Sequence, residues 1–153
     1  MRAAVSAILL VAACTAAAPA RQDGSIFRTV KIGFDQPVTL GEPLRADVRV
    51  LLEPAGDHRF RVRKGLFGDA QSIVVVTRPD GAVRCMEFTY APGFDYAASV
   101  ADYRRSLGAP QSSTGASADS VQVTRWQDAR TAFELTRRGT HVSSLLCDRA
   151  ESP

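Results

Sequence analysis

The stretch SIVVVTRPDGAVRCMEFTY, residues 72–90, decides the fold. Its first part, residues 72–77, is an apolar run rich in β-branched side chains, which is typical of a buried strand. The next four residues, Arg78-Pro79-Asp80-Gly81, form a strong turn signal. Residues 82–90 follow as a second strand, whose successive side chains point to opposite faces. The stretch therefore predicts a hairpin whose first strand is buried.

Other segments add further strands and a helix. Strand-like patterns occur at residues 26–36, 58–64, 121–126, 131–137 and 141–148. Residues 95–107 form the clearest helix, with Asp95 as its N-cap. Its apolar stripe consists of Tyr96, Val100, Tyr103 and Leu107. These patterns predict one α+β domain over residues 26–150, in which one or two helices pack on an antiparallel sheet.

Residues 39–53 fit two structures. Thr39 and Glu42 have capping-box spacing, and Pro43 suits a first helical turn, which favours a helix. Alternate residues of the same segment are also apolar, as in a strand. If the helix forms, residues 39–90 and 94–148 become two α-β-β-β units. Residues 128–148 can then be aligned on 69–89 at a constant offset of 59, which places Val142 on Val83.

Residues 1–20 have the features of an export leader. Arg2 precedes the short apolar run VSAILLVAA, and small residues follow, as cleavage requires. Val11-Ala12-Ala13-Cys14 matches a lipobox, which makes Cys14 the lipidated residue and leaves residues 21–25 in a polar tether. The alternative is cleavage at the A-x-A-like site Ala18-Pro19-Ala20 and plain secretion.

The two remaining cysteines, Cys85 and Cys147, are predicted to form a disulfide, because cysteine pairs of exported proteins are oxidised in the compartment they reach. Net charge is only +3 and is spread along the chain, which argues against nucleic acid as a partner.

A family resemblance covers residues 39–148 at most. Tyr103-Arg-Arg-Ser-Leu-Gly108-Ala-Pro110, followed by strands with Trp126 and Phe133, resembles the SmpA/OmlA (BamE-like) outer-membrane lipoproteins. Two such units in tandem resemble the architecture of β-lactamase-inhibitor proteins. The resemblance implies a protein-binding module of the envelope or an inhibitor of an enzyme.

Candidate binding residues come from one strand and one aromatic. Arg59, Arg61 and Arg63 alternate with Phe60 and Val62, so the arginines share a face that can contact anionic groups. Trp126 is a candidate exposed anchor for a partner, and the alternative is a second-layer residue of the core. No phosphate loop, zinc-ligand spacing or nucleophile elbow occurs, so no catalytic residue, metal or cofactor is predicted.

The sequence thus favours a non-enzymatic bacterial envelope protein, periplasmic and anchored to the outer membrane, that binds another protein or the cell wall. A secreted inhibitor of a hydrolase is one alternative. A small periplasmic enzyme with His141 as its base is another.

Overall fold

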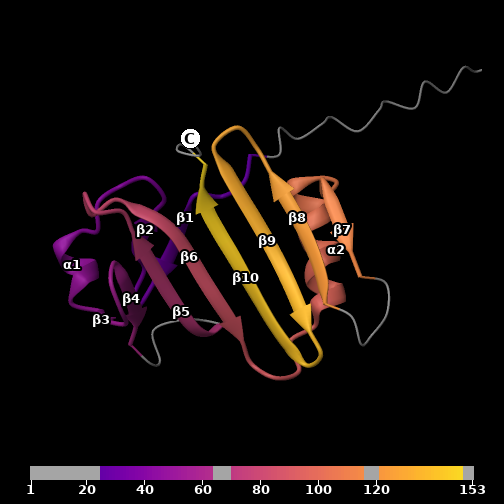
Figure 1. The fold of residues 1–153 in the computed structure, drawn as a ribbon, viewed down its shortest axis with the longest axis horizontal. Coiled ribbons are helices and arrows are strands. Elements are labelled where there is room, and N and C mark those ends of the chain that lie inside the picture. The colour runs from indigo at the N-terminus through magenta and orange to yellow at the C-terminus, as the bar shows by residue number, and fades with distance from the viewer. Residues whose placement is uncertain (1–24, 64–69, 116–120, 150–153) are drawn as a thin grey trace, which may run out of the picture.

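Most of the chain forms one antiparallel sheet, in a computed structural model that describes residues 25–63, 70–115 and 121–149. The eight strands lie in the order β3-β4-β5-β6-β10-β9-β8-β7 (Figure 1). They are β3 Leu52–Pro54, β4 Arg59–Val62, β5 Ala70–Thr77, β6 Val83–Tyr90, β7 Ser112–Thr114, β8 Gln122–Gln127, β9 Thr131–Arg138 and β10 His141–Asp148. Each half is a meander of four strands, and the halves join where β6 pairs with β10.

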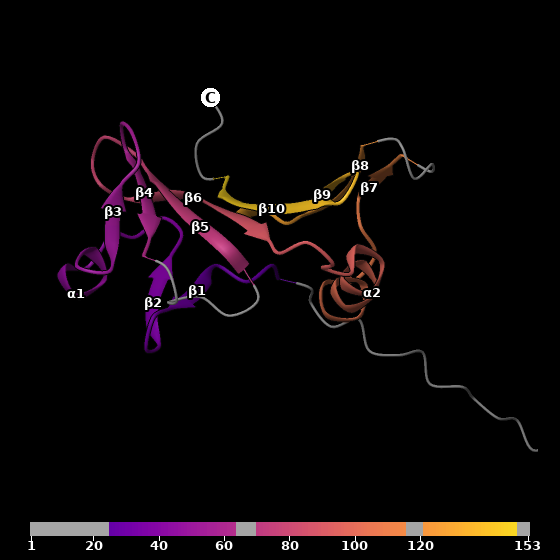
Figure 2. The same cartoon turned by 90° about the horizontal axis from the view of Figure 1, so that it is seen from below.

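The remaining elements all lie on one side of this sheet. They are the hairpin of β1 Thr29–Ile32 and β2 Gln36–Thr39, the helix α1 Ala46–Arg49 and the helix α2 Tyr96–Leu107. Figure 2 shows the hairpin and α1 below one half of the sheet and α2 below the other. The two ends of the sheet bend away from these elements, so the opposite face is concave. We call this opposite side, which no described element covers, the uncovered face.

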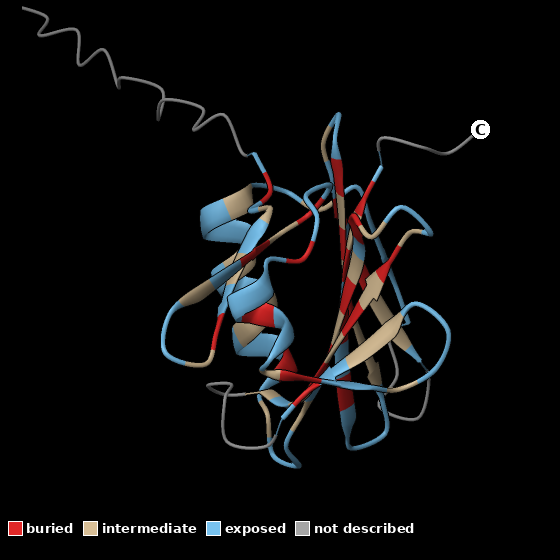
Figure 3. Ribbon diagram, turned by 90° about the vertical axis from the view of Figure 1, so that its left-hand side faces the viewer, coloured by how far each residue is buried: buried red, intermediate tan, exposed pale blue. Residues whose placement is uncertain are grey.

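The core fills the space between the sheet and this second layer (Figure 3). In the first half, Ile32, Val38 and Leu40 pack with sheet residues such as Val75 and Met86. In the second half the core is aromatic: Tyr103 meets Phe133 edge-on at 4.6 Å between ring centroids. The pKa of Tyr103 is raised to about 12, mainly because the side chain is buried and to a smaller extent because Tyr90 is close to it.

The predicted α+β class is wrong: the protein is mostly β, and its two helices are a minor part of the described chain. The segment 39–53 explains the error. Strand β2 ends at Thr39, and the backbone of Glu42 then bonds to β6, where its oxygen accepts from Val83 N at 2.9 Å. Only Ala46–Arg49 are helical, and β3 begins at Leu52. The capping-box spacing was therefore present without a helix of useful length.

The second helix is confirmed. The Asp95 side chain accepts a hydrogen bond from Ala98 N at 2.9 Å, and Tyr96, Val100, Tyr103 and Leu107 all face the core. Each half contains four strands after its helix, so the expected three-strand units are wrong.

The offset of 59 is also displaced by one residue through β6 and β10. It sets the fully buried Met86 on the exposed Leu145, because a bulge at residue 84 shifts the register.

The segment that precedes β1 is tied by hydrogen bonds to the turn between β8 and β9. Ile26 N donates to Asp128 Oδ2 at 2.8 Å, and the same carboxylate accepts from the amides of Arg130 and Thr131. Burial alone raises the pKa of Asp128, but these three amides, with the charge of Arg28, outweigh it and leave the pKa below its usual value. The start of the domain is thereby held at the β8–β9 turn.

Candidate interaction surface

A single row of side chains crosses the middle of the uncovered face. Strand register places its members directly opposite one another on neighbouring strands, and alternation directs them away from the core. In order across the sheet they are Arg61, Val74, Glu87, Leu145, Glu134 and Arg125. We call them the central row.

Leu145 is the apolar centre of this row. Its side chain stands between Glu87 and Glu134, and the residue is 38% exposed. The only described large hydrophobics that are more exposed are Phe34, Val50 and Val121. Since Leu145 lies on the strand where the two halves join, it occupies the middle of the concave surface.

Arginines hold both glutamates beside Leu145. The Arg59 guanidinium donates to the two carboxylate oxygens of Glu87 at 2.9 and 2.6 Å, a bidentate pair that raises the pKa of Arg59. On the other side, Arg125 Nε donates to Glu134 Oε2 at 2.6 Å, and Thr136 donates to the second oxygen. Each carboxylate is thus paired with an arginine, and Leu145 stands between the two ion pairs.

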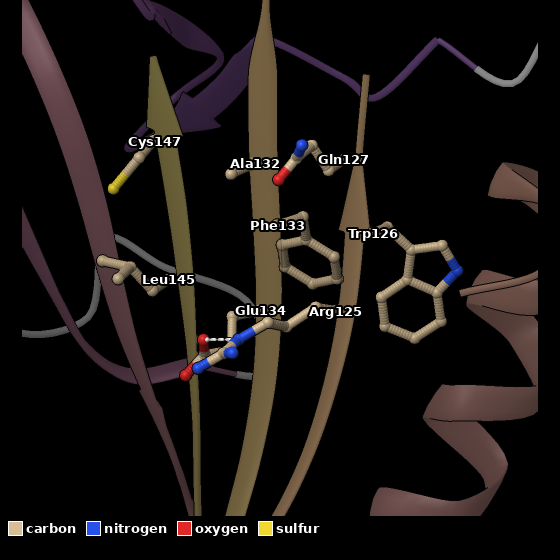
Figure 4. Close-up of a pocket in the computed structure, with 8 residues that line it drawn as sticks. All are labelled: Arg125, Trp126, Gln127, Ala132, Phe133, Glu134, Leu145 and Cys147. Atoms are coloured by element: carbon tan, nitrogen blue, oxygen red, sulfur yellow. Dashed lines mark hydrogen bonds and ion pairs between the residues drawn. The ribbon is translucent and has the colours of Figure 1, made fainter. Parts of the chain in front are cut away.

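Two hollows flank Leu145. The first, of about 290 Å³, is lined by Leu145, Cys147, Ala132, Glu134, Arg125 and Gln127, with Trp126 and Phe133 behind (Figure 4). The second, of about 300 Å³, shares Leu145 and Glu134 and continues over hydroxyl residues such as Thr89 and Ser143. These volumes lie at the bottom of the range of small-molecule pockets and suit single side chains of a partner.

The predicted disulfide is present and lies on this face. Cys85 and Cys147 are direct partners on β6 and β10, and their sulfurs are bonded. The bond therefore joins the two halves next to Leu145 and holds the surface in one shape.

The three arginines predicted to bind a partner are near this surface. Arg59 and Arg61 belong to the uncovered face, because they lie opposite Val76 and Val74. Arg63 follows β4, and its Nε is 3.7 Å from Glu53 Oε1. Cys14, the predicted lipidation site, lies outside the described residues.

The prediction of Trp126 as an exposed anchor is wrong. The residue is 2% exposed, and its Nε1 donates to Gly108 O at 3.0 Å. Figure 4 shows the indole turned toward α2, where it contacts Tyr103 and Phe133. Trp126 therefore belongs to the core and positions β8 against the helix.

Leu145 was not among the binding residues predicted from the sequence. One signal was available: Leu145 and Leu146 are adjacent in a strand, so one of them must point away from the core. Register alone decides that Leu146 is buried and Leu145 is not.

His58 and His141 are both exposed. Within residues 25–63, 70–115 and 121–149, no three His, Cys, Asp or Glu side chains are grouped so that they could hold a metal ion. The same part of the chain has no helix long and apolar enough to cross a membrane.

Comparison with known proteins finds no matching family model, curated protein or solved structure. The resemblance to SmpA/OmlA lipoproteins therefore stays a prediction from short motifs.

Proposed function

We propose that this chain is an exported, lipid-anchored envelope protein that binds a partner protein through the uncovered face of its sheet. The observation that carries the proposal is the central row: an exposed leucine, framed by two Arg–Glu pairs, in the middle of a concave face. Partner-binding surfaces commonly combine an apolar centre with a polar rim that excludes water.

The architecture supports a binding role in a second way. Extended strands and the Cys85–Cys147 bond hold the surface rigid, so little conformational entropy is lost when a partner binds. Arg61 adds a cation to the same row and is exposed. A protein that presents an apolar side chain, with a carboxylate a few strand spacings away, would complement Leu145 and Arg61.

The disulfide also supports export, because such bonds persist in oxidising compartments. Together with the leader-like residues 1–20, it favours a periplasmic site with Cys14 attached to the outer membrane. A hydrolase inhibitor would use the same face, and its partner would be an enzyme that loses activity in the complex.

Site-specific photocrosslinking in the intact envelope tests the proposal. A photoreactive residue replaces Leu145 or Arg61 on the uncovered face, or Ala101 on the exposed side of α2 as the control. We expect adducts of one mass from Leu145 and Arg61, and none of that mass from Ala101. Adding Leu145→Asp to the Arg61 probe should abolish its adduct. Equal adducts from both sides of the molecule, or none from Leu145, would contradict the proposal.

A further inference from the structure

Two large hydrophobic side chains are much more exposed than the other large hydrophobics of the described chain. Phe34 is 87% exposed and Val50 is 65% exposed, whereas Val121, the next, is 40% exposed. Single exposed apolar residues are ordinary on protein surfaces. Phe34 and Val50 are unusual because both exposed fractions are extreme.

The β1–β2 turn contacts the segment after α1, and each of the two residues is next in sequence to a residue of that contact. A Cβ placed on Gly33 would meet Leu51 Cδ1 at 2.9 Å, so the turn rests on Leu51. Phe34 follows Gly33 directly, and Val50 precedes Leu51. We call Phe34, Val50 and the partly buried Leu51 the hairpin–helix patch.

The turn presents Phe34 to the outside in a defined way. Gly33 and Asp35, on either side of it, both have positive φ angles, of 59° and 83°. Lys31 Nζ and Asp35 Oδ1 close the turn at 2.8 Å. Phe34 therefore stands at the tip of the tight turn between β1 and β2.

Charge around the patch is balanced. Residues 29–51 contain three cations (Lys31, Arg45 and Arg49) and three acids (Asp35, Glu42 and Asp47). Two of the acids are in ion pairs, Asp35 with Lys31 and Asp47 with Arg45. A binding partner of this patch is therefore selected by apolar contact and little by charge.

The proposed lipid on Cys14 suggests what covers the patch. Ile26, which is fixed to Asp128, comes twelve positions after Cys14. A fully extended segment of that length reaches at most about 40 Å. A lipid on Cys14 would keep the domain beside the membrane at high local concentration, where two apolar side chains suffice as a second attachment.

We propose that the hairpin–helix patch inserts into the phospholipid surface, with Phe34 as its deepest side chain. This inference rests on the membrane attachment included in the proposed function. The hairpin and α1 lie on the side of the sheet opposite the uncovered face (Figure 2). Insertion of the patch therefore turns the central row away from the membrane, toward a partner in the surrounding compartment.

Photolabelling from lipid tests this inference without any partner. The full chain, exported and processed by its host, is reconstituted into vesicles of phosphatidylethanolamine and phosphatidylglycerol. These contain a phosphatidylcholine with a diazirine in its acyl chain. We expect label in the tryptic peptides 32–45 and 50–59, which hold Phe34 and Val50. Peptide 139–149, which holds Leu145, should carry none.

Variants then separate insertion from mere tethering. Phe34→Ser with Val50→Ser should lower labelling of the two peptides about tenfold. Phe34→Trp should retain it, and the control Val121→Ser should not change it. Label confined to residues 14–25, equal label on both faces, or unchanged labelling of the double serine variant would overturn the inference. Because no partner is present, failure here is distinct from failure of the Leu145 crosslink.

Discussion

Removing the disulfide should weaken the whole domain, because the bond connects the two halves of the sheet. Cys85 and Cys147 are separated by 62 residues. Closing a loop of that length lowers the entropy of the unfolded chain by an amount worth about 4 kcal/mol at 25 °C. Cys85→Ala with Cys147→Ala should lower the free energy of unfolding by that amount. For a domain of roughly 125 residues this corresponds to a fall in Tm of about 15 °C.

Urea unfolding followed by circular dichroism under non-reducing conditions measures this change. A matched control replaces Thr89 and Ser143 with alanine, since these residues are paired on the same strands and the same face without a covalent bond. That control should lose less than about 1 kcal/mol. A loss below about 1 kcal/mol for the double cysteine variant would refute the view that the bond fixes the β6–β10 junction.

Three further changes probe the core and the domain entry. Trp126→Ala should cost about 3–5 kcal/mol in urea unfolding, because a buried indole is lost; an effect near zero would mean that Trp126 is exposed. Asp128→Asn should reduce stability above pH 3.8, and its difference from the wild type should vanish as the pH falls through the lowered folded pKa. Since the pKa of Tyr103 is raised from 10.0 to about 12, the wild type should lose stability as the pH rises through that interval. Tyr103→Phe should remove this loss, and unchanged pH curves would argue against the assigned environments.

The central hairpin and the second helix could be predicted from the sequence because local signals determine them. The turn Arg78–Gly81 joins β5 and β6, and Gly81 has the positive φ of 88° that such a turn needs. Asp95 and the aromatic stripe likewise act within one helix. The disulfide followed from the small number of cysteines.

Which face of each strand points to the core was harder to predict, because contacts with residues distant in the sequence decide it. In residues 121–126, Val121 and Val123 alternate with Thr124 and Trp126, and the two valines are the apolar pair; yet Thr124 and Trp126 are the residues that point inward. Thr124 is accepted in the core because its hydroxyl shares a 2.9 Å hydrogen bond with the Tyr96 hydroxyl. Tyr96 is 28 residues away, so no local pattern shows this pairing.

The helix predicted for residues 39–53 was wrong for a similar reason. Its helical signals are genuine, but pairing of Glu42 with Val83 and of Leu52 with Val62 removes both ends from any helix. Long-range strand pairing prevailed over local propensity.

Binding of the crosslinked partner, once purified, to variants of the central row tests the main claim most directly. Leu145→Asp places a charge at the apolar centre, and we predict that it weakens the Kd at least about 100-fold. Ala101→Asp, on the exposed side of α2 and away from the uncovered face, should leave the Kd within about threefold of the wild-type value. Equal affinity of the wild type and Leu145→Asp would contradict a partner site on the uncovered face.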